Sequence, residues 1–92
     1  DPGQALRAPR WALTSGTDQG FDTWHGPANV GIEADAPPEW SADLRARGHE
    51  VTTRPPWDSG CGMAHCIEVR PDGTVLGGAS DPRAPEAAAL AF

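Results

Sequence analysis

Short runs of alternating apolar and polar residues predict several strands along this chain. In residues 29–33, two β-branched residues alternate with polar or small neighbours, which is the period of a half-buried strand. Residues 63–70 and 74–78 flank a Pro-Asp-Gly sequence, in which proline sets φ and glycine accepts a positive φ. These two runs are therefore predicted to form a C-terminal β-hairpin. Shorter strands are predicted at residues 10–13 and 50–53.

A different spacing predicts helices. Between residues 38 and 47, Trp40 and Leu44 stand one turn apart, acidic residues come early and arginines late, and Gly48 follows. This segment is the one clear helix of the chain. A shorter helix is predicted over residues 1–8, because Asp-Pro at its start supplies an N-cap and a first-turn proline.

The remaining segments are rich in proline, glycine and polar residues and predict loops at residues 14–26 and 54–60. Residues 82–92 are broken by proline and then rich in alanine, which predicts a frayed tail. A chain of 92 residues is one small domain at most, so residues 1–92 are treated as a single segment. The expected fold class is α+β with short strands.

Charge narrows the range of partners. The chain contains seven arginines, no lysines and 13 acidic residues, which gives a net charge of −6. Phosphate backbones and anionic lipids would be repelled, so no nucleic acid and no membrane surface is expected as a partner. No apolar run reaches the roughly 18 residues of a spanning helix. Because the chain begins at Asp1 and its one methionine is Met63, we expect a processed product or a piece of a longer protein.

The two cysteines, Cys61 and Cys66, are spaced C-x4-C, and no second pair completes a tetrahedral metal site. No metal and no cofactor is therefore predicted. Extended chain between them would separate the sulfurs too far for a disulfide unless Gly62 turns, so both are predicted to be free thiols. A hydrolase built on Cys61, His65 and Asp58 is disfavoured, because no helix begins after Cys61 to acidify its thiol.

Other polar residues offer weak candidates for chemistry. The carboxylates are scattered and predicted to be solvated, even in pairs such as Glu33 with Asp35 or Asp72 with Asp81. His25 and His49 are predicted to be surface residues, and the four tryptophans are explained by core packing. In the segment that contains Ser80, Asp81 and Arg83, two readings stay open: an amino-acid-binding group or a structural Asp–Arg clamp.

Three blocks of sequence resemble the C-terminal part of the gamma-glutamyltransferase family. They are Ala8-Pro9-Arg10-Trp11, the segment from Leu44 to Val51, and Pro71-Asp72-Gly73 followed by Gly78-Ala79-Ser80-Asp81-Pro82-Arg83. The resemblance implies an N-terminal nucleophile hydrolase fold, an αββα four-layer sandwich. In such enzymes a precursor cuts itself into two subunits, and the freed threonine attacks the γ-glutamyl carbonyl of glutathione or a related amide.

The family's nucleophile, its glutamate-binding residues and its oxyanion-hole glycines all precede the segment that this chain matches. No catalytic residue is therefore assigned here, and the substrate-binding residues are unknown. The resemblance implies a large subunit and the remainder of the small subunit as partners, and a γ-glutamyl small molecule as substrate. It also implies export to the periplasm or the medium, although the residues themselves equally fit a cytoplasmic protein.

The chain departs from the family pattern at three places. His65 stands where a glutamine is usual, residues 57–62 enlarge a loop, and Ala84-Pro85-Glu86 replaces an acidic-glycine continuation. The alternative reading is a stand-alone, non-catalytic binding module derived from that family. On the first reading, strands cut from their sheet expose the apolar face of Ile67, Val69 and Val75, so the isolated chain is expected to unfold partly or to self-associate.

Overall fold

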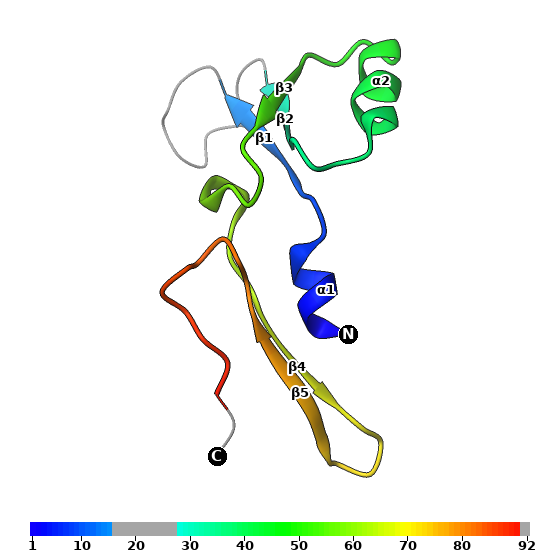
Figure 1. Cartoon of the computed structure of the whole chain (residues 1–92). Coiled ribbons are helices and arrows are strands. Elements are labelled where there is room, and N and C mark those ends of the chain that lie inside the picture. Colours follow the sequence, from blue (N-terminus) through cyan, green and yellow to red (C-terminus); the bar gives the residue numbers. More distant parts are fainter. Residues whose placement is uncertain (16–27, 91–92) are drawn as a thin grey trace. The chain divides into compact units, whose positions relative to one another are not determined.

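The computed structural model describes residues 1–15 and 28–90, which form an α+β arrangement of helices and short strands (Figure 1). The chain divides into two compact units. The hairpin unit comprises Asp1–Ala8 and Gly62–Phe92, and the sheet unit comprises Pro9–Cys61. The predicted fold class, α+β, is confirmed. Most of the loop predicted at residues 14–26, including His25, lies outside the described residues.

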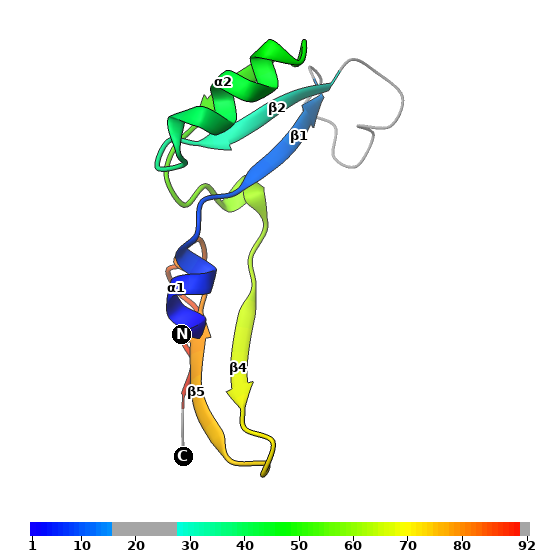
Figure 2. The same cartoon turned by 90° about the vertical axis from the view of Figure 1, so that its right-hand side faces the viewer.

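The sheet unit contains three strands in the order β1-β2-β3. Strand β2 (Ala28–Glu33) pairs antiparallel with β1 (Trp11–Ser15) and parallel with β3 (Val51–Arg54). The parallel pair needs a crossover, and helix α2 (Pro38–Ala46) supplies it, as Figure 2 shows. A short 3-10 turn, η1 (Ser59–Cys61), follows β3.

Helix α2 is confirmed: it begins at Pro38, as predicted, and ends at Ala46, one residue before the predicted end. Proline occupies its first position, Glu39 stands in the first turn and Arg45 in the last. Gly48 has φ +89°, a left-handed conformation that glycine adopts without steric cost and that ends the helix. Arg45 also donates from Nη2 to the carbonyl of Val51, 3.2 Å away, which ties the helix end to β3.

Strand β2 is the buried centre of the sheet unit. Val30 and Ile32 are buried, as their alternation predicts, but Gly31 and Glu33 on the opposite face are buried too. The tryptophans do not form this core: Trp11, Trp40 and Trp57 are all exposed. The prediction that they serve core packing is wrong for these three, because the buried residues of the sheet unit all come from β2; Trp24 lies outside the described residues.

The hairpin unit joins helix α1 (Pro2–Arg7) to the predicted hairpin, which is formed by β4 (His65–Val69) and β5 (Val75–Ser80). The Asp1 side chain caps α1 by accepting from the Gly3 amide at 2.8 Å, as predicted. The strands pair antiparallel, with an irregularity at Glu68/Val69. The turn between them places Gly73 at φ +85°, and Arg70 and Thr74 close it by a backbone hydrogen bond.

The two-stranded sheet of β4 and β5 leaves apolar side chains uncovered. Helix α1 packs against both β4 and β5, whereas Ile67, Val69 and Val75 remain largely exposed. Ile67 is 69% exposed, although it is a β-branched residue in the middle of a strand. The predicted uncovered apolar face is therefore present; the side chain of Leu76 lies outside what the structure describes.

The segment after β5 differs from its prediction as a frayed tail. Asp81, Arg83 and Ala84 are buried, and backbone hydrogen bonds join Ala84 to Asp81 and Ala87 to Ala84. Only the alanine-rich stretch beyond Ala84 is mostly exposed. The prolines of this segment argue against regular secondary structure and for that reason predict a frayed tail. The segment is ordered by hydrogen bonds to other parts of the hairpin unit, which its own sequence does not reveal.

Candidate functional site

The most deeply buried charges of the hairpin unit belong to Asp81 and Arg83. Their side chains are fully buried and form an ion pair of 3.1 Å between Arg83 Nη1 and Asp81 Oδ1. Arg83 Nη1 also donates to the carbonyl of Leu6 at 2.9 Å, and its Nη2 donates to the carbonyl of Ala8 at 3.1 Å. Asp81 accepts from the amides of Ala64 and Arg83, each at 3.0 Å.

These contacts decide between the two readings of the segment. The guanidinium donates hydrogen bonds to carbonyls at the C-terminal end of α1, which lack partners within the helix. The carboxylate accepts a hydrogen bond from the chain that leads into β4. Because both groups are buried and engaged within the protein, they are a structural clamp rather than a receptor for an amino acid. The prediction that Asp81 is a solvated carboxylate is wrong. Beside them, the buried Ser80 hydroxyl has no hydrogen-bond partner among the described residues.

The sheet unit buries a carboxylate of its own, Glu33, which is 1% exposed. Its Oε2 accepts from the Arg10 amide at 2.8 Å and its Oε1 from the Asp58 amide at 2.9 Å. One side chain at the end of β2 therefore fixes both the chain entering β1 and the loop after β3. The prediction that Glu33 is solvated is wrong. Its carboxylate loses its hydration on burial, and the hydrogen bonds from these two amides compensate for that loss.

Next to Glu33, Arg54 and Asp58 form a half-buried ion pair, with 2.7 Å between Nε and Oδ2. The second oxygen of Asp58 accepts from the Gly60 amide at 2.8 Å. A Cβ atom at Gly60 would collide with Nη2 of Arg54, so a side chain at this position would require the guanidinium to shift. The hydrogen bond from Arg54, followed by that from Gly60, lowers the pKa of Asp58, and the same bond to Asp58 raises the pKa of Arg54.

The lowered pKa of Asp58 predicts an acid dependence of the sheet unit. A carboxyl whose pKa is lowered on folding stabilises the protein fully above its ordinary value of 3.8, and this contribution is lost as the pH falls through the lowered pKa. We expect Asp58→Asn to lower the urea midpoint at neutral pH and to flatten its fall in acid. Tryptophan fluorescence can follow this, since all four tryptophans belong to the sheet unit. The exposed Asp35→Asn is the matched control, and equal acid slopes in both variants would refute the assignment.

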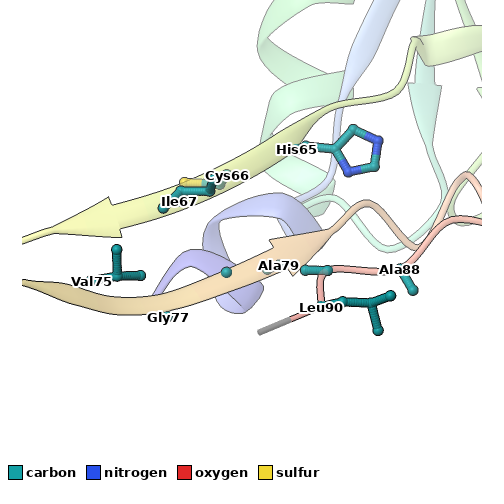
Figure 3. Close-up of a pocket in the computed structure, with 10 residues that line it drawn as sticks. His65, Cys66, Ile67, Val75, Gly77, Ala79, Ala88 and Leu90 are labelled. Atoms are coloured by element: carbon teal, nitrogen blue, oxygen red, sulfur yellow. The ribbon is translucent and has the colours of Figure 1, made fainter. Parts of the chain in front are cut away.

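The hairpin unit carries a groove of about 660 Å³ between the hairpin and the C-terminal tail (Figure 3). Its walls are mostly apolar or small, and at Gly78 the tail comes so close that an added Cβ would lie 3.4 Å from Ala89. The lining residues are His65, Cys66, Ile67, Val75, Gly77, Gly78, Ala79, Ala88, Ala89 and Leu90. With one imidazole and one thiol from adjacent strand positions, the groove offers a surface for packing rather than a set of reacting groups.

A second hollow, of about 250 Å³, lies in the sheet unit between β1 and α2. Trp11 and Trp40 line it together with Ile32, Asp43 and Leu44. Sequence reasoning missed this hollow, because it treated tryptophans in a small domain as core. The signal that marks it is the helical spacing of Trp40, Asp43 and Leu44, which places an aromatic ring and a carboxylate on one face of α2.

The remaining predicted candidates do not gather into a site. Asp58 is engaged by Arg54, and His49, His65 and Asp35 are exposed. Asp72 is exposed and accepts from both the amide and the hydroxyl of Thr74, and the hydroxyl bond, followed by the amide bond, lowers its pKa.

Cys61 and Cys66 are half-buried thiols not joined in a disulfide, as predicted, although Gly62 does turn, with φ +80°. No three His, Cys, Asp or Glu residues of the described chain cluster as metal ligands.

Comparison with known proteins adds no assignment. No protein-family model matches the chain, and no curated protein resembles it at a significant level. Within residues 1–15 and 28–90, neither helix has the length and apolar character needed to cross a membrane.

Proposed function

We propose that this chain is the C-terminal segment of a gamma-glutamyltransferase-like enzyme, which transfers or hydrolyses γ-glutamyl groups of glutathione or related amides. The nucleophile is an N-terminal threonine on chain outside this segment. The segment itself contributes strands and helices to an αββα sandwich, not reacting groups. The observation that carries the proposal is the order and spacing of the three sequence blocks, from Ala8 to Arg83.

Contacts in the hairpin unit support this reading. Arg83, in the last block, donates to the carbonyl of Ala8, the first residue of the first block, across 75 sequence positions. In the same block Asp81 accepts from Ala64 ahead of β4. The first and the last block thus meet at one buried ion pair, which gives a physical reason for these two blocks to occur together in one chain.

The uncovered surface of the hairpin supports the partners that the proposal requires. Ile67, Val69 and Val75 need a covering layer, and Ile67 and Val75 also line the mostly apolar groove. In the proposed enzyme the remainder of the small subunit and the large subunit supply that layer, and a γ-glutamyl small molecule binds on those other parts. Export to the periplasm or the medium belongs to the same proposal.

The proposal predicts that the 92-residue chain alone has no activity. A purified chain incubated with a γ-glutamyl anilide should release no more chromogenic amine than a blank, since none of its threonines is N-terminal. The intact product of the reading frame that contains this segment should release it, and replacing that product's processed N-terminal threonine by alanine should abolish the release. An inactive intact product, or an active isolated chain, would contradict the proposal.

The alternative is a stand-alone, non-catalytic binding module derived from the same family. The exposed tryptophans of the sheet unit favour it, because indole rings at a surface are typical of binding sites. The two readings differ in whether the chain is complete without partners. The state of association of the isolated chain in solution distinguishes the enzyme segment from the stand-alone module.

A further inference from the structure

The hollow between β1 and α2 combines three features that packing alone does not explain. Trp11 is 59% exposed and Trp40 is 40% exposed, although both are large aromatic residues of regular elements. Ile32 is buried and Leu44 half-buried, so the residues that line the hollow beside the two indoles are apolar. Asp43 is the one charged residue that lines it within residues 1–15 and 28–90.

The backbone holds these groups in place before any ligand arrives. Trp11 is paired directly with Ile32 in the register of β1 and β2, which fixes these two lining residues relative to each other. Trp40, Asp43 and Leu44 stand at positions i, i+3 and i+4 of α2, so they share one face of the helix. A site on regular elements loses little conformational freedom on binding, which favours affinity.

Size and charge then select the ligand. At about 250 Å³ the hollow is smaller than the pockets that bind drug-sized molecules. It can therefore hold one small chemical group of a ligand rather than a whole large ligand. Indole rings attract cations over their faces, most strongly those that are weakly hydrated. Asp43 adds a negative charge, makes no ion pair among the described residues, and belongs to a chain of net charge −6.

We propose that the hollow lined by Trp11, Trp40 and Asp43 binds an alkylated ammonium group, such as the trimethylammonium group of choline. The methyl groups contact the indole rings and the apolar lining, and the carboxylate balances the charge. An ammonium with free N–H groups would lose more hydration on entering and binds less well. The site is independent of the γ-glutamyl chemistry proposed above.

Titration of the chain carrying Ile67→Lys, a substitution in the hairpin unit that opposes self-association and lies outside the hollow, tests this with choline chloride, read by the indole N–H resonances in nuclear magnetic resonance spectra. Signals of Trp11 and Trp40 should shift with a dissociation constant on the order of millimolar, while Trp57 stays unchanged. Dimethylbutanol, in which carbon replaces the nitrogen of choline, should bind at least about tenfold more weakly. Sodium chloride at equal concentration controls for ionic strength.

Two variants complete the test. Asp43→Asn should weaken choline binding about three- to tenfold, whereas Glu39→Gln, one turn earlier on α2 and outside the lining, should leave it unchanged. Equal binding of choline and dimethylbutanol would overturn the proposal in favour of a plain apolar hollow. Equal losses in both variants, or no shift of the two indole signals, would also overturn it.

Discussion

Replacing Arg83 by alanine should strongly destabilise the hairpin unit. The substitution leaves the Asp81 carboxylate buried without its cation and removes the donors to the carbonyls of Leu6 and Ala8. Removing one partner of a buried ion pair costs about 3–5 kcal/mol. Small domains have about 5–15 kcal/mol of stability in total, so this loss is a large fraction of the stability available to a unit of this size.

Amide hydrogen exchange can measure this loss directly. The amides of Ala64 and Arg83 donate to Asp81, and their protection should fall by two orders of magnitude or more in Arg83→Ala, about 1.4 kcal/mol for each tenfold. Arg70→Ala, at an exposed position beside the hairpin turn, is the control and should change stability by less than about 0.5 kcal/mol. Retained protection in Arg83→Ala would show that the ion pair contributes little.

Local signals predict most of the secondary structure of this chain. Asp1-Pro2 begins α1, Gly48 ends α2 and Gly73 turns the hairpin, each through a conformational preference of the residue itself. Strand ends differ from the predictions by one or two residues. The parallel pairing of β2 with β3 was not predicted, because it depends on where α2 returns the chain and not on either strand's own pattern.

The buried charges could not be predicted in the same way. Glu33 and Asp81 look like other carboxylates of an acidic chain, and what buries them is a partner far away in sequence: the Asp58 amide for Glu33 and the Ala64 amide for Asp81. The Asp–Arg clamp was one of two readings, and sequence alone left it undecided. Burial of a charge is set by tertiary hydrogen bonds, which no local pattern encodes.

The isolated chain is expected to self-associate through its hairpin or to be partly unfolded. Within the described residues, β4 and β5 pair only with each other, so their outer edges keep backbone groups that another strand can bind. A two-stranded hairpin is marginally stable in water unless something covers it. Its exposed valines and Ile67 give a second copy an apolar surface to pack against.

Sedimentation over a range of micromolar concentrations, together with amide exchange, measures this. Ile67→Lys and Val75→Lys should each shift the chain toward monomer, because a charge on the exposed face opposes the pairing of strands between molecules. Ala42→Lys adds the same charge on the exposed surface of α2 and should leave association unchanged. If the unsubstituted chain is instead a compact monomer with well-protected amides in β4 and β5, the hairpin needs no covering layer. The segment is then an autonomous domain, the requirement for enzyme partners is lost, and the binding-module reading is favoured.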